Sequence, residues 1–268
     1  MELFLQAVPI FLLIFCRITS FFVVAPVFST RGVPTMFKIG LGFFVSLLVY
    51  LVYGIHETVV PDVQYPLFII REILAGLLLG FVAYMFFTVV QTAGSFIDMQ
   101  MGFGLANVID PMTGTTSPLL GNFKFIIVVL LFLTMNGHHL LLLGIMRSYD
   151  WLPLSNTLFG RIYEGSVTEF LAVTFGYTFM LALQLAAPLV VAMFLTDVGL
   201  GFLARVAPQY NVFVIGIPLK ILVGFLLLML LMPGFAVLIG ELFERMFGAM
   251  DDVLRLMAQP SAEMGGTP

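Results

Sequence analysis

Residues 3–28 read LFLQAVPIFLLIFCRITSFFVVAPVF, an apolar run with one arginine, Arg17, near its middle. One helix needs about 20 mostly apolar residues to cross a bilayer core, so this run is long enough to span. It is too long for the core of a signal peptide and has no basic segment before it, so we expect it to be retained. Arg17 does not fit, since a central arginine in a spanning helix costs roughly 2.5–3.5 kcal/mol. Either it pairs with a carboxylate or lines a wet passage, or it snorkels from a tilted helix that does not face lipid.

The rest of the chain is also strongly apolar. Of its 268 residues, 61% are hydrophobic and 10% are charged, and the mean hydropathy is +1.12. Soluble domains carry about a quarter charged residues, so this is a membrane-class polypeptide. The net charge is −4 and the Lys and Arg residues are scattered. No basic face can form, which excludes nucleic acid as a partner.

Six apolar segments predict six helices by their length and composition. The segments are residues 3–28, 37–55, 67–91, 125–146, 170–195 and 212–239. Hydropathy does not show that each helix contacts lipid, because a helix wrapped by protein has the same composition. We therefore predict an all-α fold of polytopic, membrane-associated helical hairpins.

Two of these segments are expected to continue as amphipathic helices. Polar residues at helical spacing follow the third segment, namely Gln91, Ser95, Asp98 and Gly102. This stripe extends the third helix toward a glycine-rich turn region around Asp110 and Pro111. Charged and apolar residues alternate at helical spacing after Gly240, which predicts an amphipathic helix there. Residues 259–268 are expected to be a disordered tail.

Several polar residues lie in or near the apolar segments. Five charged residues are close to segment ends, where water can solvate them: Arg71, Glu72, Asp197, Arg205 and Lys220. We interpret each as an end-anchoring charge. Gln184 and Pro188 lie inside the fifth segment, where a proline bends a helix and frees backbone groups. They indicate a kinked helix that is packed by protein.

The sequence predicts no catalytic residue, no metal and no cofactor. His138 and His139 point about 100° apart on a helix, so they cannot share one ligand face, and no cysteine or histidine cluster supplies further ligands. No nucleophile elbow, phosphate-binding loop or paired carboxylates stand out.

Residues 101–121, MGFGLANVIDPMTGTTSPLLG, hold four glycines and no Lys or Arg between two apolar segments. Their apolar side chains can fill a hole without specific hydrogen bonds, and Asp110 and Pro111 shape a turn, so the segment has the properties of a movable stopper. The candidate plug residues are Met101, Phe103, Leu105, Val108, Ile109, Asp110, Pro111 and Met112. Gly94, Gly102 and Gly104 are candidate hinges, because glycine changes backbone shape easily. From the residues alone, an ordinary mobile surface loop is the commoner interpretation.

Several short motifs add a family resemblance. They are Gln100–Gly102, Val108–Pro111, Asn136–His138, Ser29–Pro34 and above all Ala204–Leu219, within which Pro208, Gln209, Phe213, Gly216 and Pro218 lie. Individually these motifs are short, but in order and spacing they strongly resemble the FliR family of flagellar export proteins, whose virulence-system sister family is SctT. The likeness runs from about Phe15 to Met250.

The resemblance implies a subunit of the type III export gate, located in the bacterial inner membrane at the flagellar basal body. Such a subunit assembles with FliP and FliQ into a channel for unfolded flagellar proteins, with FlhB and FlhA adjoining. It implies one export-gate domain over residues 1–258, in which a FliP-like part to about residue 165 precedes a FliQ-like hairpin. Residues 101–117 then form a plug, and Arg17 and Gln184 are polar residues between helices that protein surrounds.

Two other classes remain as alternatives. A small-molecule or ion transporter with a site near the bilayer midplane needs convergent charges on facing helices or an internal repeat. The sequence offers Arg17 but no obvious carboxylate within a span. An intramembrane enzyme needs a nucleophile and a base, for which no pair of residues is evident.

Overall fold

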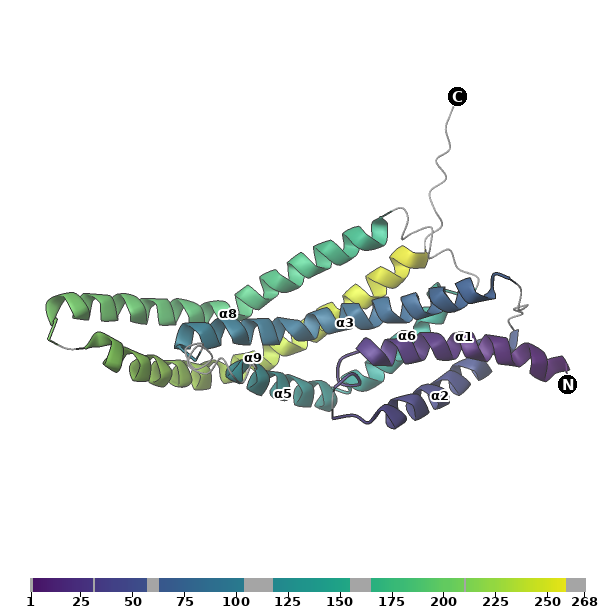
Figure 1. The fold of residues 1–268 in the computed structure, drawn as a ribbon, viewed down its shortest axis with the longest axis horizontal. Coiled ribbons are helices and arrows are strands. Elements are labelled where there is room, and N and C mark those ends of the chain that lie inside the picture. Colours follow the sequence, from purple (N-terminus) through teal and green to yellow (C-terminus); the bar gives the residue numbers. More distant parts are fainter. Residues whose placement is uncertain are drawn as a thin grey trace, which may run out of the picture. The chain divides into compact units, whose positions relative to one another are not determined.

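The computed structural model describes residues 2–30, 32–56, 63–103, 118–154, 165–209 and 211–258, without the side chains of residues 2–6 and 213. Across these ranges the chain is helical and contains no strand, which confirms the predicted all-α fold. The helices, drawn in Figure 1, are α1 (Glu2–Val24), α2 (Thr35–Val52), the short 3-10 helix η1 (Gly54–His56), α3 (Tyr65–Met101), α5 (Leu119–Thr134), α6 (Gly137–Trp151), α8 (Ser166–Val206) and α9 (Val212–Ala258).

Five of the described helices are long and apolar enough to cross a membrane: α1, α2, α3, α8 and α9. The count rises to six if α5 and α6 are taken together as one broken span. The sequence predicted a single helix over residues 125–146, but the structure breaks it at Asn136. Asn136 has a left-handed backbone with φ 56°, a conformation that asparagine tolerates better than most residues.

Both predicted helix extensions are present. Helix α3 continues beyond Gln91 to Met101 and ends at Gly102, whose φ of 92° leaves the helical region. The turn expected around Asp110 and Pro111 lies outside the described residues. Helix α9 continues to Ala258, and its last turns bury apolar side chains and expose acidic ones, as the spacing predicted. The tail expected over residues 259–268 also lies outside the described residues.

The chain divides into two compact units. Unit 1 comprises residues 1–85, 136–175 and 244–268, and unit 2 comprises residues 86–135 and 176–243. Helices α3, α8 and α9 each contribute one part to both units. The predicted boundary near residue 165, between a FliP-like part and a FliQ-like hairpin, stays a prediction.

In unit 1, helix α1 packs closely on α3 through two glycines of α3. A Cβ added at Gly76 would collide with the backbone oxygen of Arg17 and with the side chain of Ser20. A Cβ at Gly80 would lie 3.0 Å from the backbone oxygen of Phe21. Small residues one turn apart allow two helix backbones to approach closely, which is a common contact between apolar helices.

A buried ion pair lies at this helix contact. Arg17 Nε donates to Glu72 Oε2 at 2.6 Å, and both side chains are 0% exposed. The same guanidinium donates to Ser148 Oγ at 3.1 Å and to the Leu152 carbonyl at 2.9 Å. It also lies 4.1 Å from the ring centroid of Tyr149. Arg17 therefore joins α1 to α3 and to the end of α6, and its partners come from within the chain.

The interpretation of Arg71 and Glu72 as end-anchoring charges is wrong. Arg71 is 4% exposed and Glu72 is 0% exposed. Arg71 donates to the Leu154 carbonyl, and its Nε lies 3.6 Å from Glu72 Oε1. Helix α3 begins at Tyr65, before the apolar run, so Glu72 lies well inside the helix and is packed against α1 rather than water.

We predict that Glu72→Ala lowers the free energy of unfolding by about 3–5 kcal/mol, because it leaves the Arg17 guanidinium buried without its anion. The measurement is denaturant unfolding of the purified full chain in detergent. Glu244→Ala, at an exposed position of α9, serves as the control and changes stability by about 0.5 kcal/mol or less. Replacing both partners by apolar residues, Arg17→Met with Glu72→Leu, restores most of the loss. Equal stability of Glu72→Ala and the control would contradict the assignment.

Candidate functional site

The helices on either side of residues 104–117 cross in unit 2 at a pair of glycines. A Cβ at Gly94 of α3 would collide with the Cα of Gly121 on α5 and lie 2.7 Å from its nitrogen. A Cβ at Gly121 would lie 3.2 Å from the backbone oxygen of Gln91. The close approach of the two backbones leaves no room for a side chain at position 94, which explains the glycine there. The role of Gly94 as a hinge stays a prediction.

A carboxylate from α3 caps the start of α5. Asp98, which is 5% exposed, accepts the Leu120 N–H at 3.1 Å on both of its oxygens and the Gly121 N–H at 3.5 Å. The first N–H groups of a helix have no partner within the helix, and an anion there is favourable. Pro118, which precedes α5, supplies no such cap. Asp98 therefore fixes the end of α3 to the start of α5, a role that its place in the polar stripe did not reveal.

Beyond Asp98, the end of α3 packs on α9. Met101 is 0% exposed, and a Cβ at Gly224 would lie 2.8 Å from its sulfur. The ring of Phe103 lies edge-on to that of Phe225, with centroids 6.3 Å apart. Gly102, between them, has no atom within 4 Å of an added Cβ, so its positive φ is the reason for glycine there. Two predicted plug residues thus contact α9 through apolar packing.

Polar side chains join the same end of α3 to the hairpin of α8 and α9. Lys220 Nζ lies 2.8 Å from Asp197 Oδ1, and Gln100 Nε2 donates to Asp197 Oδ2 at 3.3 Å. The Asp197 side chain is 41% exposed and that of Lys220 is 17% exposed. We call these three residues the polar latch. Asp197 and Lys220 line a hollow of about 340 Å³ together with Met101 and Gly102.

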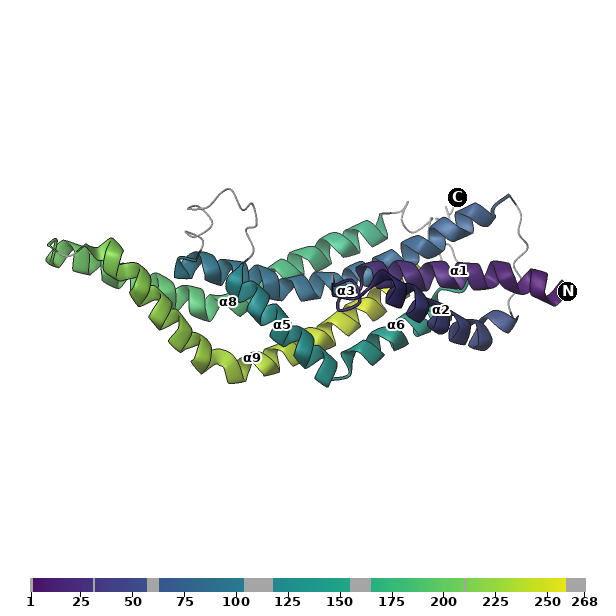
Figure 2. The same cartoon turned by 60° about the horizontal axis from the view of Figure 1, so that its bottom comes forward.

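The residues of the predicted family motif surround the connection between α8 and α9. The second half of α8 and the first half of α9 run side by side in both ribbon views (Figures 1 and 2). Pro208 and Gln209 lie in the turn, and Pro218 lies inside α9. A Cβ at Gly216 would lie 3.2 Å from a methyl of Leu200, which explains a glycine at this helix contact. The side chain of Phe213 lies outside the described residues.

The remaining predicted site residues are placed as follows. Gln184 is exposed on α8 and makes no hydrogen bond within the described part of the chain, so its predicted contact between helices stays a prediction. Seven predicted plug and hinge residues fall outside the described ranges: Gly104, Leu105, Val108, Ile109, Asp110, Pro111 and Met112.

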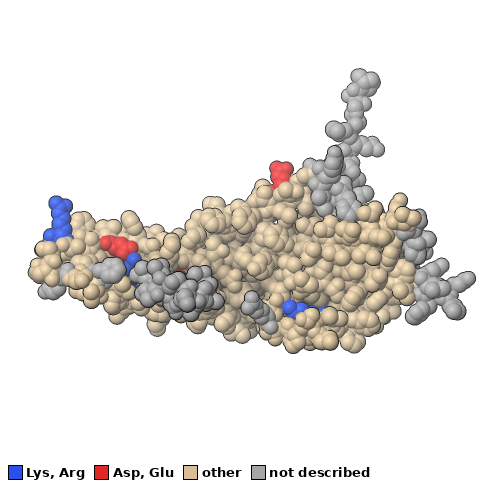
Figure 3. Space-filling view, in the orientation of Figure 1, with Lys and Arg blue, Asp and Glu red and all other residues tan. Residues whose placement is uncertain are grey.

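The described residues contain no group of three or more His, Cys, Asp or Glu side chains that could hold a metal ion. On the face drawn in Figure 3, charged side chains are few and widely spaced. The site is built from helix packing, one cap and one ion pair. These contacts hold the ends of the two helices that flank residues 104–117.

The fold and site define a class: a polytopic all-α membrane-type protein in which a glycine-rich segment lies between two anchored helix ends. The chain belongs to a family described as "Bacterial export proteins, family 1", whose model matches residues 8–246.

Curated relatives agree with this family. The chain is 42% identical to the flagellar biosynthetic protein FliR of Bacillus subtilis (strain 168) over 249 residues, which are 93% of this chain and 96% of that protein. It is 33% identical to the FliR protein of Pectobacterium carotovorum over 90% of both chains. It is 31% identical to that of Escherichia coli (strain K12) over 89% of this chain and 90% of that protein.

We predict that Asp98→Ala loosens the start of α5, because it removes the acceptor of two backbone N–H groups. Loss of a helix cap costs about 0.5–2 kcal/mol. Amide hydrogen exchange measured by mass spectrometry should therefore quicken in peptides that contain Leu120 and Gly121. Asp252→Ala, at an exposed position of α9, is the control and leaves these peptides unchanged. Unchanged exchange in Asp98→Ala would show that the cap does not hold α5.

Proposed function

We propose that this chain is a subunit of the flagellar type III protein export gate in the bacterial inner membrane. In this proposal it assembles with FliP and FliQ into the channel for unfolded flagellar proteins, and FlhB and FlhA adjoin the channel. Membership of an export family and the FliR relatives support the assignment. The membrane-length helices support a membrane location.

Residues 101–117 act as the plug of this channel. The observation that carries this role is the architecture of the segment's base: Asp98 and Gly94 fix both flanking helices, whereas Met101 and Phe103 are held on α9 by apolar contacts. Apolar contacts are non-directional, so they can be exchanged for contacts with a passing polypeptide. The near absence of charge in this segment suits a channel that admits many different chains.

The apolar surface of the α8–α9 hairpin is the proposed contact with the other gate subunits. In the most apolar 18-residue stretch of α9, 11% of the stretch is buried within the chain. In the corresponding stretch of α3, 61% is buried. Large apolar side chains exposed on the hairpin include Phe194, Phe202, Leu222 and Met229. Exposed apolar surface of this extent marks contact with protein or lipid. Gln184 lies exposed on the same hairpin and can donate and accept hydrogen bonds there.

The alternative function is a transporter with a site near the midplane, and it requires charged groups on facing helices. Arg17 and Glu72 are opposite charges on facing helices. However, Arg17 also bonds to Ser148 and Leu152, and the ion pair is fully buried. These partners accept hydrogen bonds from all three guanidinium nitrogens inside the chain, so the cluster is better explained as a structural joint than as a substrate site. In the export proposal the chain catalyses no reaction, and motive force and substrate selection come from its partners.

We expect stable assembly of the chain to require FliP and FliQ. Affinity purification of the tagged full chain should recover both from cells that express all three, and omission of either should lower the yield of the chain. A transporter should instead purify as a stable monomer or symmetric oligomer that moves a small solute alone. That result would overturn the export-gate assignment.

We expect deletion of residues 101–117 to make the inner membrane leaky to small ions, because the plug is lost while the channel remains. The measurement is ion permeability of cells that carry the variant, compared with cells in which FliP is also absent. Normal permeability together with normal secretion would contradict the plug.

Locking the plug should block export reversibly. The test ties the end of α3 to α9 by a disulfide between Phe103→Cys and Phe225→Cys, and its formation is checked by mass spectrometry. The two native rings lie edge-on, with centroids 6.3 Å apart. Secretion of flagellar proteins should fall after oxidation and recover with reductant. Each single variant is a control, and Cys16, the only native cysteine, is replaced by Ala in all of them. Normal secretion with the disulfide formed would show that this contact need not open.

A further inference from the structure

Lys124 of α5 is a buried cation, and the proposed export function assigns no role to it. The residue is 6% exposed, and its ammonium lies 5.5 Å from the ring centroid of Phe235 on α9. Among the described residues no carboxylate lies within ion-pair distance of it. Asp98 attracts it electrostatically, but that carboxylate already accepts the backbone N–H groups of α5. An ammonium in largely apolar surroundings with no anion in contact is unfavourable, so this position favours a negative partner.

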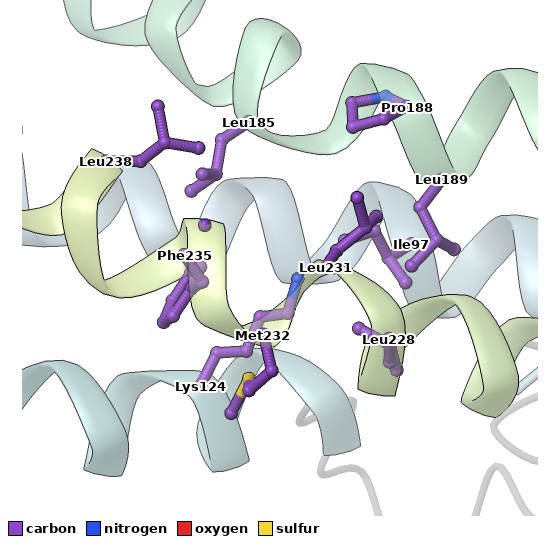
Figure 4. Close-up of a pocket in the computed structure, with 11 residues that line it drawn as sticks. Ile97, Lys124, Leu185, Pro188, Leu189, Leu228, Leu231, Met232, Phe235 and Leu238 are labelled. Atoms are coloured by element: carbon purple, nitrogen blue, oxygen red, sulfur yellow. The ribbon is translucent and has the colours of Figure 1, made fainter.

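The side chain of Lys124 lines two apolar hollows of unit 2. One, of about 100 Å³, lies among α3, α5, α8 and α9, and Figure 4 shows Lys124 extending from α5 toward α9 beside it. The other, of about 280 Å³, lies between α5 and α9. Lys124, Leu228 and Met232 line both hollows. Among the described residues that line either hollow, Lys124 carries the only charge, and the others are apolar or glycine.

We propose that these hollows bind an anionic amphiphile, an acyl chain whose carboxylate or phosphate head group pairs with Lys124. An apolar wall with one convergent charge is the usual design of a small-ligand site. Basic pockets between membrane helices bind anionic lipid head groups, and the apolar lining accepts methylene groups without leaving any polar atom unsatisfied. The ligand comes either from an anionic phospholipid or from a free fatty acid, and both present the same chemistry to the site.

The test uses the full chain, co-expressed with its partner subunits, purified in mild detergent and examined by native mass spectrometry. Phosphatidylglycerol, phosphatidylethanolamine and palmitate are added separately at equal concentration. We expect one anionic ligand per chain, held at least tenfold better than zwitterionic phosphatidylethanolamine. Retention of phosphatidylglycerol identifies a phospholipid source, and retention of palmitate alone identifies a fatty acid.

Two variants separate the head-group contact from the acyl contact. Lys124→Met keeps the length of the side chain, removes the charge and should lose the anionic ligand at least tenfold. Leu228→Trp keeps Lys124, fills both hollows and should lose it as well. Lys38→Met, on α2 in unit 1, is the matched control and should bind as the native chain does. Retention of the lipid is measured on the purified complex that each variant gives. The result therefore does not depend on whether secretion needs this site.

Three outcomes would overturn the proposal. The first is equal retention of phosphatidylglycerol and phosphatidylethanolamine, and the second is full retention by Lys124→Met. The third is a zero-length carbodiimide cross-link between Lys124 and an acidic side chain of a partner subunit, which would show that a protein carboxylate occupies this position.

Discussion

The buried ion pair between Arg17 and Glu72 is the constraint on which unit 1 depends. Apolar helices slide past one another at little cost, since one leucine contact replaces another, whereas a charge pair out of water has one favourable register. Gly76 brings the two backbones close enough for the pair to be enclosed, and Ser148 and Leu152 extend it to α6. We infer that the pair specifies which turns of α1, α3 and α6 meet, while apolar packing supplies most of the stability.

Unit 2 also combines a glycine contact between helices with a buried carboxylate. The contact of Gly94 with Gly121 brings α3 and α5 together, and Asp98 then fixes their register through backbone N–H groups rather than through an arginine. Each unit thus combines a glycine crossing, which permits close approach, with one buried carboxylate, which allows a single alignment. In a chain with so few charged residues, each buried carboxylate therefore has a large share in determining the fold.

Much of the fold could be predicted because length, apolar composition and period determine helices directly. The long-range partners could not. The sequence indicates that Arg17 needs a partner, but it suggests an interfacial charge at Glu72, because the place of Glu72 at the edge of an apolar run says nothing about what faces it. Lys124 lies just before the predicted apolar segment 125–146, and its place in the sequence does not indicate its burial. The sequence predicts one helix through Asn136, because a single left-handed residue leaves the hydropathy unchanged.

The strengths of these contacts decide which part of the proposed gate can move. Asp98 is buried, so releasing α5 from it would leave its carboxylate and two N–H groups without partners, at a penalty of roughly 1–3 kcal/mol for each N–H group and more for the carboxylate. The polar latch is half open to water at Asp197, where an ion pair contributes about 0–1 kcal/mol. Met101 and Phe103 are held by contacts that a passing apolar side chain can replace. In the proposed gate, movement is therefore easiest beyond Asp98, which puts the boundary between the scaffold and the proposed plug in the last turn of α3.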